Sequence, residues 1–128
     1  MTATSIGNAT ILVVEDEQNM LNVLERILLG HRYKVLKATD GEKALDIYRC
    51  HDQTIDVVLL DIGLPKISGR DVLFEIKNNN PDAKIIVASG YLEPELKAQV
   101  DCAGVNHFLH KPYMLDEVVK AVQSVLAA

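Results

Sequence analysis

The chain has 128 residues, of which 48% are hydrophobic and 24% charged, a mixture typical of one soluble globular domain rather than of a disordered segment. Its formal net charge of −5 argues against a nucleic-acid-binding domain, which normally carries a basic face. No apolar run approaches the roughly 20 residues that cross a bilayer, and the N-terminus lacks the basic and apolar regions of a signal peptide. We therefore expect a cytoplasmic protein that binds neither nucleic acid nor membrane directly.

Residues 1–9 are small and polar, so we expect a tail or linker there and a single domain over residues 10–128. The two cysteines, Cys50 and Cys102, are too few for a disulfide framework and lie in helix-like segments. We interpret them as small packing residues in a reducing compartment.

In chain order, short apolar runs alternate with segments whose apolar residues recur at helical spacing. The run at 11–14 precedes a helical pattern that Gly30 closes. A short strand is predicted at 33–36, and Asp40 can cap the helix that follows it. The run at 57–60 is continuous, as expected of a strand covered on both faces.

The second half of the chain repeats this alternation. Ser68 and Asp71 form a plausible cap for the next helix, and 85–88 is the fourth apolar run. Pro94 suits the first turn of a helix and Gly104 its end. Residues 106–110 are predicted as the fifth strand, and an apolar stripe over 115–126 as the last helix.

Five strands that alternate with five helices predict an α/β fold, a doubly wound five-stranded parallel sheet with helices on both faces. Ligands of such folds bind beyond the carboxyl ends of the strands. Polar side chains follow four of the predicted strands at that edge, namely Glu15, Asp16, Asp61, Ser89 and Lys111. The sequence therefore predicts a site at one rim of the sheet.

Three carboxylates at one rim repel one another and need a cation to remain ionised together. Their oxygen ligands suit Mg²⁺. Taken alone, the acids after the first strand could be helix caps, Ser89 a loop serine and Lys111 a surface lysine. These separate interpretations do not explain why all these groups share one rim.

Asp61 is the candidate nucleophile, because a carboxylate can attack phosphorus and form an acyl phosphate. Such chemistry needs a metal to offset the charge of the phosphoryl group. It also needs a cation and hydroxyl donors for the phosphoryl oxygens, and Lys111 and Ser89 supply these.

Four segments of the chain read, in order, VVEDE, LLDIGLPKISG, VASGY and FLHKPY. The ordered set resembles the signature segments of response-regulator receivers, and the resemblance runs from Ala9 to the C-terminus. It implies a flavodoxin-like fold and a phosphoacceptor domain of two-component signalling. The implied roles are Asp61 as phosphoacceptor, Glu15 and Asp16 as the acid pair, the Gly63 carbonyl as a further metal ligand, Ser89 as the switch hydroxyl, Lys111 as the phosphate-binding lysine, Phe108 as the rotating aromatic, and Pro65 and Gly69 as the turn after the phosphoacceptor.

Three residues depart from the usual pattern of these receivers. Glu15 stands where the pattern has Asp, which lengthens its side chain and makes room for a water between it and the metal. Ser89 replaces Thr, and Phe108 replaces Tyr. Phe108 has no hydroxyl to offer a partner, so we expect the readout to rest on packing.

The resemblance also implies a switch. A phosphoryl group on Asp61 would draw the Ser89 hydroxyl inward, and Phe108 would rotate into the space that Ser89 leaves. The face formed by the fourth helix, the fifth strand and the fifth helix would then change shape.

The resemblance implies as partners a histidine kinase or histidine phosphotransfer protein, an output partner of unknown identity, and a second copy of the chain in a phosphorylation-dependent homodimer. Because no output domain follows, we expect a stand-alone regulator or the receiver of a longer protein such as a hybrid histidine kinase. We expect a signalling domain rather than an enzyme, one that catalyses only its own phosphorylation and slow dephosphorylation.

Three alternatives remain open from the sequence. A haloacid-dehalogenase phosphatase also uses an aspartyl phosphate and Mg²⁺, but Gly63 stands where its second Asp would act as acid and base. A flavodoxin-like electron carrier shares the expected fold, but the acids would repel the flavin phosphate. A phosphorylation-independent interaction module is the third.

Overall fold

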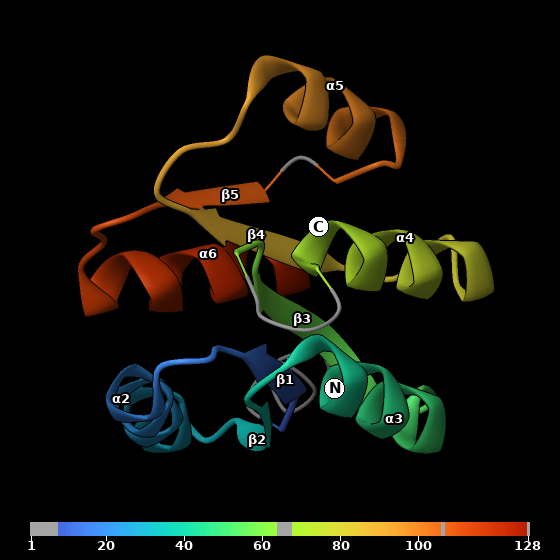
Figure 1. Cartoon of the computed structure of the whole chain (residues 1–128). Coiled ribbons are helices and arrows are strands. Elements are labelled where there is room, and N and C mark those ends of the chain that lie inside the picture. The colour runs from blue at the N-terminus through green and yellow to red at the C-terminus, as the bar shows by residue number, and fades with distance from the viewer. Residues whose placement is uncertain (1–7, 64–67, 106, 128) are drawn as a thin grey trace.

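Five parallel strands form one sheet in the computed structural model of the protein, which describes residues 8–63, 68–105 and 107–127 (Figure 1). Their order across the sheet is β2-β1-β3-β4-β5. This order confirms the predicted doubly wound parallel sheet. The strands are β1 (Thr10–Val14), β2 (Lys34–Ala38), β3 (Ile55–Asp61), β4 (Ile85–Ser89) and β5 (His107–His110).

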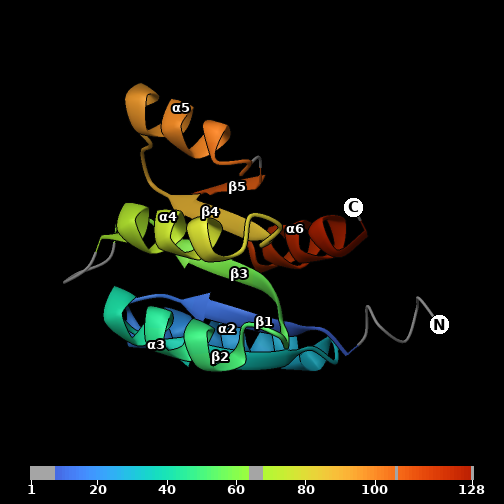
Figure 2. The same cartoon turned by 90° about the vertical axis from the view of Figure 1, so that its right-hand side faces the viewer.

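Helices cover both faces of the sheet, which gives three layers (Figures 1 and 2). Helices α2 and α6 lie on one face, and α3, α4 and α5 on the other. The helices are α2 (Gln18–Gly30), α3 (Gly41–His51), α4 (Gly69–Asn79), α5 (Pro94–Cys102) and α6 (Leu115–Ala127).

Two apolar clusters fill the spaces between the layers, because successive residues of a strand point to opposite faces of the sheet. In β1, Ile11 and Val13 pack with α2 and α6, whereas Leu12 and Val14 pack with α3 and α4. All four side chains are buried. A continuous apolar run is therefore what a central strand of this fold requires.

Side chains cap three of the helices at their N-termini. The Glu17 carboxylate, the Asp40 carboxylate and the Ser68 hydroxyl each accept a hydrogen bond from the backbone N–H three residues further on. These bonds satisfy N–H groups that have no partner within the helix. The caps predicted at Asp40 and Ser68 are confirmed, and α5 begins at Pro94 as expected.

The strand boundaries differ slightly from those predicted. β2 is displaced by one residue at its start and continues to Ala38, and β3 and β4 include Asp61 and Ser89 as their last residues. These polar residues still form ladder hydrogen bonds with the adjacent strands, so the strands do not stop where the apolar run stops. Asn106, predicted as the first residue of the fifth strand, lies outside the described residues.

The interpretation of the cysteines as packing residues is wrong, because Cys50 and Cys102 are both exposed. Each lies two residues after a buried one, Tyr48 in α3 and Val100 in α5. Two residues turn a helix by more than half a revolution, so the cysteines point away from the sheet.

Within the part of the chain that the structure describes, no helix has the length and apolar character needed to cross a membrane.

Candidate functional site

The order of the strands brings together residues that are far apart in the chain. Val14 lies beside Leu60 in the β1–β3 ladder, so Glu15 follows β1 next to Asp61 at the end of β3. On the other side, Asp61 lies beside Ala88 of β4, and the Lys111 N–H donates to the Ser89 carbonyl at 2.8 Å. These residues meet at the switch point of the sheet, where such folds bind ligands.

Three carboxylates form a cluster at this rim. One oxygen from each of Glu15, Asp16 and Asp61 lies within 4.8 Å of the other two. Glu15 is 3% exposed and Asp61 7% exposed, whereas Asp16 is exposed. The donors are all oxygens, and their spacing suits a hard divalent cation such as Mg²⁺.

Lys111 reaches into this cluster from the end of β5. Its Nζ donates to Asp61 Oδ2 at 2.9 Å and lies 3.5 Å from Glu15 Oε1. Burial lowers the pKa of Lys111, but the hydrogen bond to Asp61 and the two carboxylate charges outweigh it, so its pKa lies above the ordinary value. The carboxylates therefore favour the protonated, positively charged form of Lys111.

Glu15 connects the cluster to the start of α2. Its Oε2 accepts a hydrogen bond from the Glu17 N–H at 3.1 Å, so it also satisfies part of the helix N-terminus. Burial raises the pKa of Glu15, the Glu17 N–H lowers it, and the negative charge of Asp61 raises it further, which leaves the pKa above the usual value. The charged form of Glu15 is thus disfavoured in the folded protein.

Asp61 is held on both sides. While Oδ2 faces Lys111, Oδ1 accepts a hydrogen bond from the Gly63 N–H at 3.0 Å. The backbone at Gly69 lies very close to the backbone at Ile62. A Cβ at position 69 would lie 2.4 Å from the Ile62 Cα, so only glycine allows this close approach. No larger residue fits at Gly69 without a backbone shift. Pro65, predicted for the same turn, lies outside the described residues.

The two residues of the predicted switch, Ser89 and Phe108, make their contacts outside the acid cluster. The Ser89 hydroxyl donates to the Tyr91 carbonyl at 2.8 Å. Phe108 is half-buried on β5, and Lys97 Nζ lies 5.0 Å from the centre of its ring. In this conformation, the Ser89 hydroxyl is therefore hydrogen-bonded to the β4–α5 loop and not to the acid cluster.

Tyr113 is a neighbour of the site to which the sequence motifs assigned no role. It lines a hollow of about 400 Å³ together with Glu15, Met20 and Lys111. Burial raises the pKa of its phenol, and the charge of Glu15 adds to the rise, so the hydroxyl stays protonated near neutral pH. Its position directly after Lys111-Pro112 is the signal that could have indicated it.

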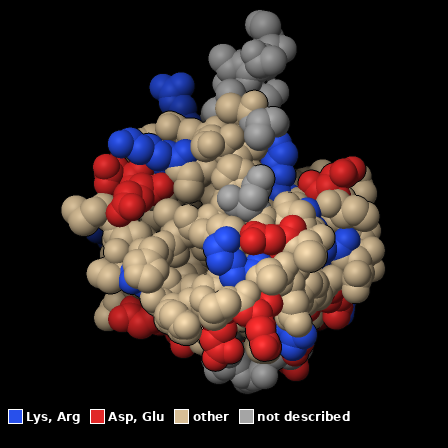
Figure 3. All heavy atoms as spheres, turned by 90° about the horizontal axis from the view of Figure 1, so that it is seen from above, with Lys and Arg blue, Asp and Glu red and all other residues tan. Residues whose placement is uncertain are grey.

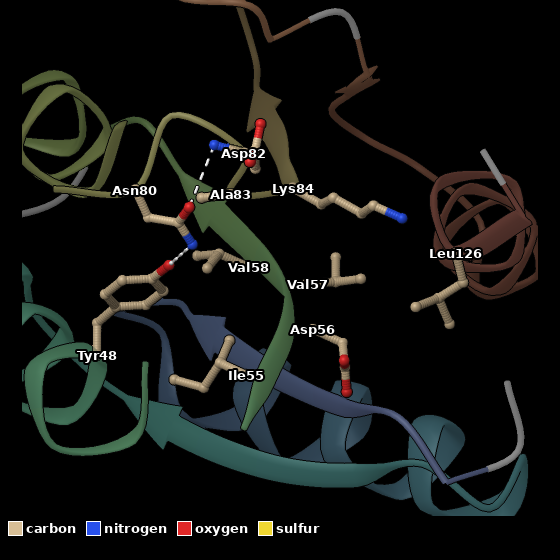
Figure 4. A pocket seen from close by; sticks show the side chains of 10 residues that line it. All are labelled: Tyr48, Ile55, Asp56, Val57, Val58, Asn80, Asp82, Ala83, Lys84 and Leu126. Carbon is tan, nitrogen blue, oxygen red and sulfur yellow. Dashed lines mark hydrogen bonds between the residues drawn. The ribbon is translucent and has the colours of Figure 1, made fainter. Parts of the chain in front are cut away.

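A second hollow, of about 160 Å³, lies at the opposite rim, beside the amino end of β3 (Figure 4). Asn80 donates through Nδ2 to the Tyr48 hydroxyl at 3.1 Å and accepts through Oδ1 from the Asp82 N–H at 3.2 Å. The acid cluster and Lys111 do not line this hollow. We therefore place the candidate site at the acid cluster.

Comparison with known proteins identifies the family of the chain. The family described as response regulator receiver domain matches residues 11–123. The chain is 33% identical to the chemotaxis protein CheY of Thermotoga maritima, over 90% of this chain and 95% of that protein. It is 32% identical to the sensor kinase CckA of Brucella abortus, over 94% of this chain but 13% of that protein.

The solved structures give the same result. A chain in the crystal structure of the CheX–CheY–BeF3–Mg²⁺ complex from Borrelia burgdorferi is 30% identical, with a TM-score of 0.84, over 91% of this chain and 88% of that one. Several curated relatives are longer proteins, of which the chain spans half or less. The chain belongs to the response regulator receiver domain family of two-component signalling.

Proposed function

We propose that Asp61 is the residue of this receiver domain that accepts the phosphoryl group. The observation that carries the proposal is the position of its carboxylate, 2.9 Å from Lys111 Nζ and within the cluster that Glu15 and Asp16 complete. A carboxylate in this setting combines a nucleophile with a cation for the incoming charge.

We further propose that Glu15, Asp16, Asp61 and the Gly63 carbonyl hold a Mg²⁺ ion. The three clustered carboxylates need more positive charge than Lys111 supplies, and oxygen donors suit this ion. When bound, the ion would offset the negative charge of the phosphoryl group. The Borrelia CheY complex contains Mg²⁺ and the phosphoryl mimic BeF3, which supports the proposal by likeness.

In the transfer, one Asp61 oxygen attacks phosphorus, a P–O bond forms, and the bond to the donor breaks. The donor is a phosphohistidine of a histidine kinase or phosphotransfer protein, and its imidazole nitrogen leaves with the electron pair of the P–N bond. The Gly63 N–H keeps the carboxylate turned into the site, and Lys111 contacts the phosphoryl oxygens. The domain then remains phosphorylated until slow hydrolysis of the acyl phosphate.

The switch follows from the same site. The phosphoryl oxygens on Asp61 would draw the Ser89 hydroxyl away from the Tyr91 carbonyl, and Phe108 would turn toward the space beside Ser89. The surface of α5, β5 and α6 would change with it. We propose this surface as the docking site of the output partner or of a second copy of the chain.

We propose that the receiver domain covers residues 10–128 and follows a tail or linker at 1–9, of which Ala9 already packs in the core, in a cytoplasmic protein. Origin from a hybrid histidine kinase is supported by the similarity to the sensor kinase CckA. The signalling family, together with Gly63 in place of a second acid, favours a receiver over a phosphatase with turnover.

Incubation with acetyl phosphate and Mg²⁺, followed by intact-protein mass spectrometry, tests the assignment. The unaltered protein should gain one phosphoryl mass, and Asp61→Asn should gain none. Asp56→Asn is the matched control, because Asp56 lies on the same strand at the opposite rim. Equal phosphoryl uptake by Asp61→Asn would show that another residue is the acceptor. Uptake by neither protein would favour a phosphorylation-independent module.

A further inference from the structure

Helix α5 is attached to the protein by fewer buried side chains than the other helices. Val100 is its one buried residue, and Leu96, together with Ala103 just after the helix, packs partly against the core. By contrast, α4 and α6 each bury four residues. In Figures 1 and 2, α5 lies at the β5 edge of the sheet. A contact between α5 and β5 therefore adds to the few contacts that hold this helix in place.

Lys97 of α5 and Phe108 of β5 make such a contact. Lys97 Nζ lies 5.0 Å from the centre of the Phe108 ring, within the range of a cation–π interaction. The same ammonium donates to Asp101 Oδ2 at 3.2 Å, which holds it on the helix surface. On this side of the molecule, charged groups of both signs stand among uncharged ones (Figure 3).

The Phe108 ring has space to leave this contact. A hollow of about 260 Å³ lies beside it, lined by Val87, Ser89, Leu92 and Lys97 among others. Ser89 keeps its hydroxyl on the Tyr91 carbonyl, 2.8 Å away, and so remains next to this space. A turn of the ring toward Ser89 would carry it away from the ammonium that Asp101 anchors.

We infer that Lys97 is a latch that holds Phe108 in its resting position. The inference rests on the proposed function, in which Phe108 moves inward after phosphorylation. The latch stabilises the resting state alone, so it lowers the inward population of Phe108 about two- to fivefold, the factor that corresponds to an exposed cation–π contact. By linkage, it weakens binding of a phosphoryl mimic by at most the same factor.

The chain contains two phenylalanines, so ¹³C-labelled phenylalanine gives one signal from Phe108 and a reference signal from Phe74 on α4. NMR spectra are recorded with and without beryllofluoride and Mg²⁺. In Lys97→Met without the mimic, the Phe108 signal should shift toward its mimic-bound position, with an inward-to-outward ratio two to five times that of the unaltered protein. The Phe74 signal should not move.

Two variants separate the latch from loss of charge or of structure. Lys97→Arg retains a cation that stacks on aromatic rings and should behave as the unaltered protein. Lys120→Met removes a lysine from a similar i,i+4 pair with Asp116 on α6. Among the residues that the structure describes, Lys120 makes no such ring contact, so this variant should also leave Phe108 unchanged. The Lys97 side chain is 53% exposed, so Lys97→Met should fold.

The outcomes distinguish the two proposals. If the mimic binds but does not move Phe108 in the unaltered protein, the proposed switch is wrong. If the mimic moves Phe108 and Lys97→Met matches the unaltered protein in signal position and mimic affinity, the latch alone is wrong. The latch is equally wrong if Lys120→Met shifts Phe108 as much as Lys97→Met does.

Discussion

The two rims of the sheet use their polar residues in opposite ways. At the carboxyl-end rim, three carboxylates lie within 4.8 Å of one another, and burial and mutual repulsion raise the pKa of Glu15. At the amino-end rim, Asn80 donates to the Tyr48 hydroxyl, and Lys77 Nζ donates to the carbonyls of Pro81 and Ala83. The hydrogen-bonded polar groups at the amino-end rim thus favour folding, whereas the clustered carboxylates at the carboxyl-end rim oppose it.

Residues that stabilise the fold and residues that serve the proposed function therefore lie at opposite ends of the strands. Substitutions that remove charge from the carboxyl-end rim should impair phosphoryl transfer or metal binding while leaving the fold intact or more stable. Substitutions that remove a hydrogen bond at the amino-end rim should destabilise the fold without altering the chemistry. Proteins commonly keep residues at a functional site that lower the stability of the fold.

Tyr48→Ala should give the largest effect, a loss of about 3–5 kcal/mol in the free energy of unfolding. The ring is 4% exposed and lies in the core between α3 and the sheet, so its removal leaves a cavity and an unpartnered Asn80 amide. Urea denaturation measures the loss. Tyr48→Phe keeps the ring and should lose only about 1 kcal/mol. Equal losses in the two variants would contradict the cavity argument.

Asp16→Asn should weaken Mg²⁺ binding at least about tenfold, because it removes one charged ligand of a site with few protein ligands. Titration calorimetry measures the affinity. In the presence of a chelator, the same variant should unfold at a higher temperature, since it relieves repulsion with Glu15 and Asp61. Unchanged affinity would remove Asp16 from the metal site.

Lys77→Met should destabilise the protein by about 1–2 kcal/mol, because the Pro81 and Ala83 carbonyls lose a charged donor. Burial lowers the pKa of Lys77, and the negative charge of Asp82 partly offsets this effect. Phosphorylation by acetyl phosphate should proceed at the unaltered rate. Lys120→Met is the control at an exposed lysine and should change stability by less than about 0.5 kcal/mol.

Glu15→Gln should stabilise the protein at neutral pH, with a gain that depends on pH. The pKa of Glu15 is raised in the folded state, so the folded protein binds its proton more tightly than the unfolded chain does. Ionisation therefore lowers stability as the pH rises through and above the ordinary value of 4.5. Thermal unfolding without Mg²⁺ should show the two proteins converging as the pH falls below that value. If the difference in unfolding temperature between the two proteins did not change with pH, the raised pKa of Glu15 would be contradicted.

Arg32→Gly should give the smallest effect, a gain of about 0.5–1 kcal/mol. Arg32 has a φ of 70° after the end of α2, a conformation that glycine adopts without strain, as Gly104 does after α5 with a φ of 92°. Arg32 lies in the loop that precedes the amino end of β2, at the rim opposite the acid cluster, so Mg²⁺ affinity should not change. Chemical denaturation of Arg32→Gly beside Arg32→Ala measures the gain, and stabilisation by Ala as well would rule out this backbone explanation.

The order of the elements and the rim that carries the site could be predicted from the amino-acid sequence. Apolar runs of strand length, separated by helical patterns, require a sheet covered on both faces. Because parallel strands end at the same edge, Glu15, Asp61, Ser89 and Lys111 could be assigned to one rim before any coordinates were known. The family signature then predicted a role for each of them.

Which of these groups are in contact depends on the three-dimensional packing and could not be predicted from the sequence. The ion pair between Glu15 and Lys111 joins residues 96 positions apart, and the Ser89 hydroxyl turns to the Tyr91 carbonyl rather than to the acids. The contact of Lys97 with Phe108 likewise depends on how α5 lies on β5. Such contacts depend on side-chain rotamers and on neighbours across the sheet, whereas periodicity along the chain reports only which face of its own element a residue occupies.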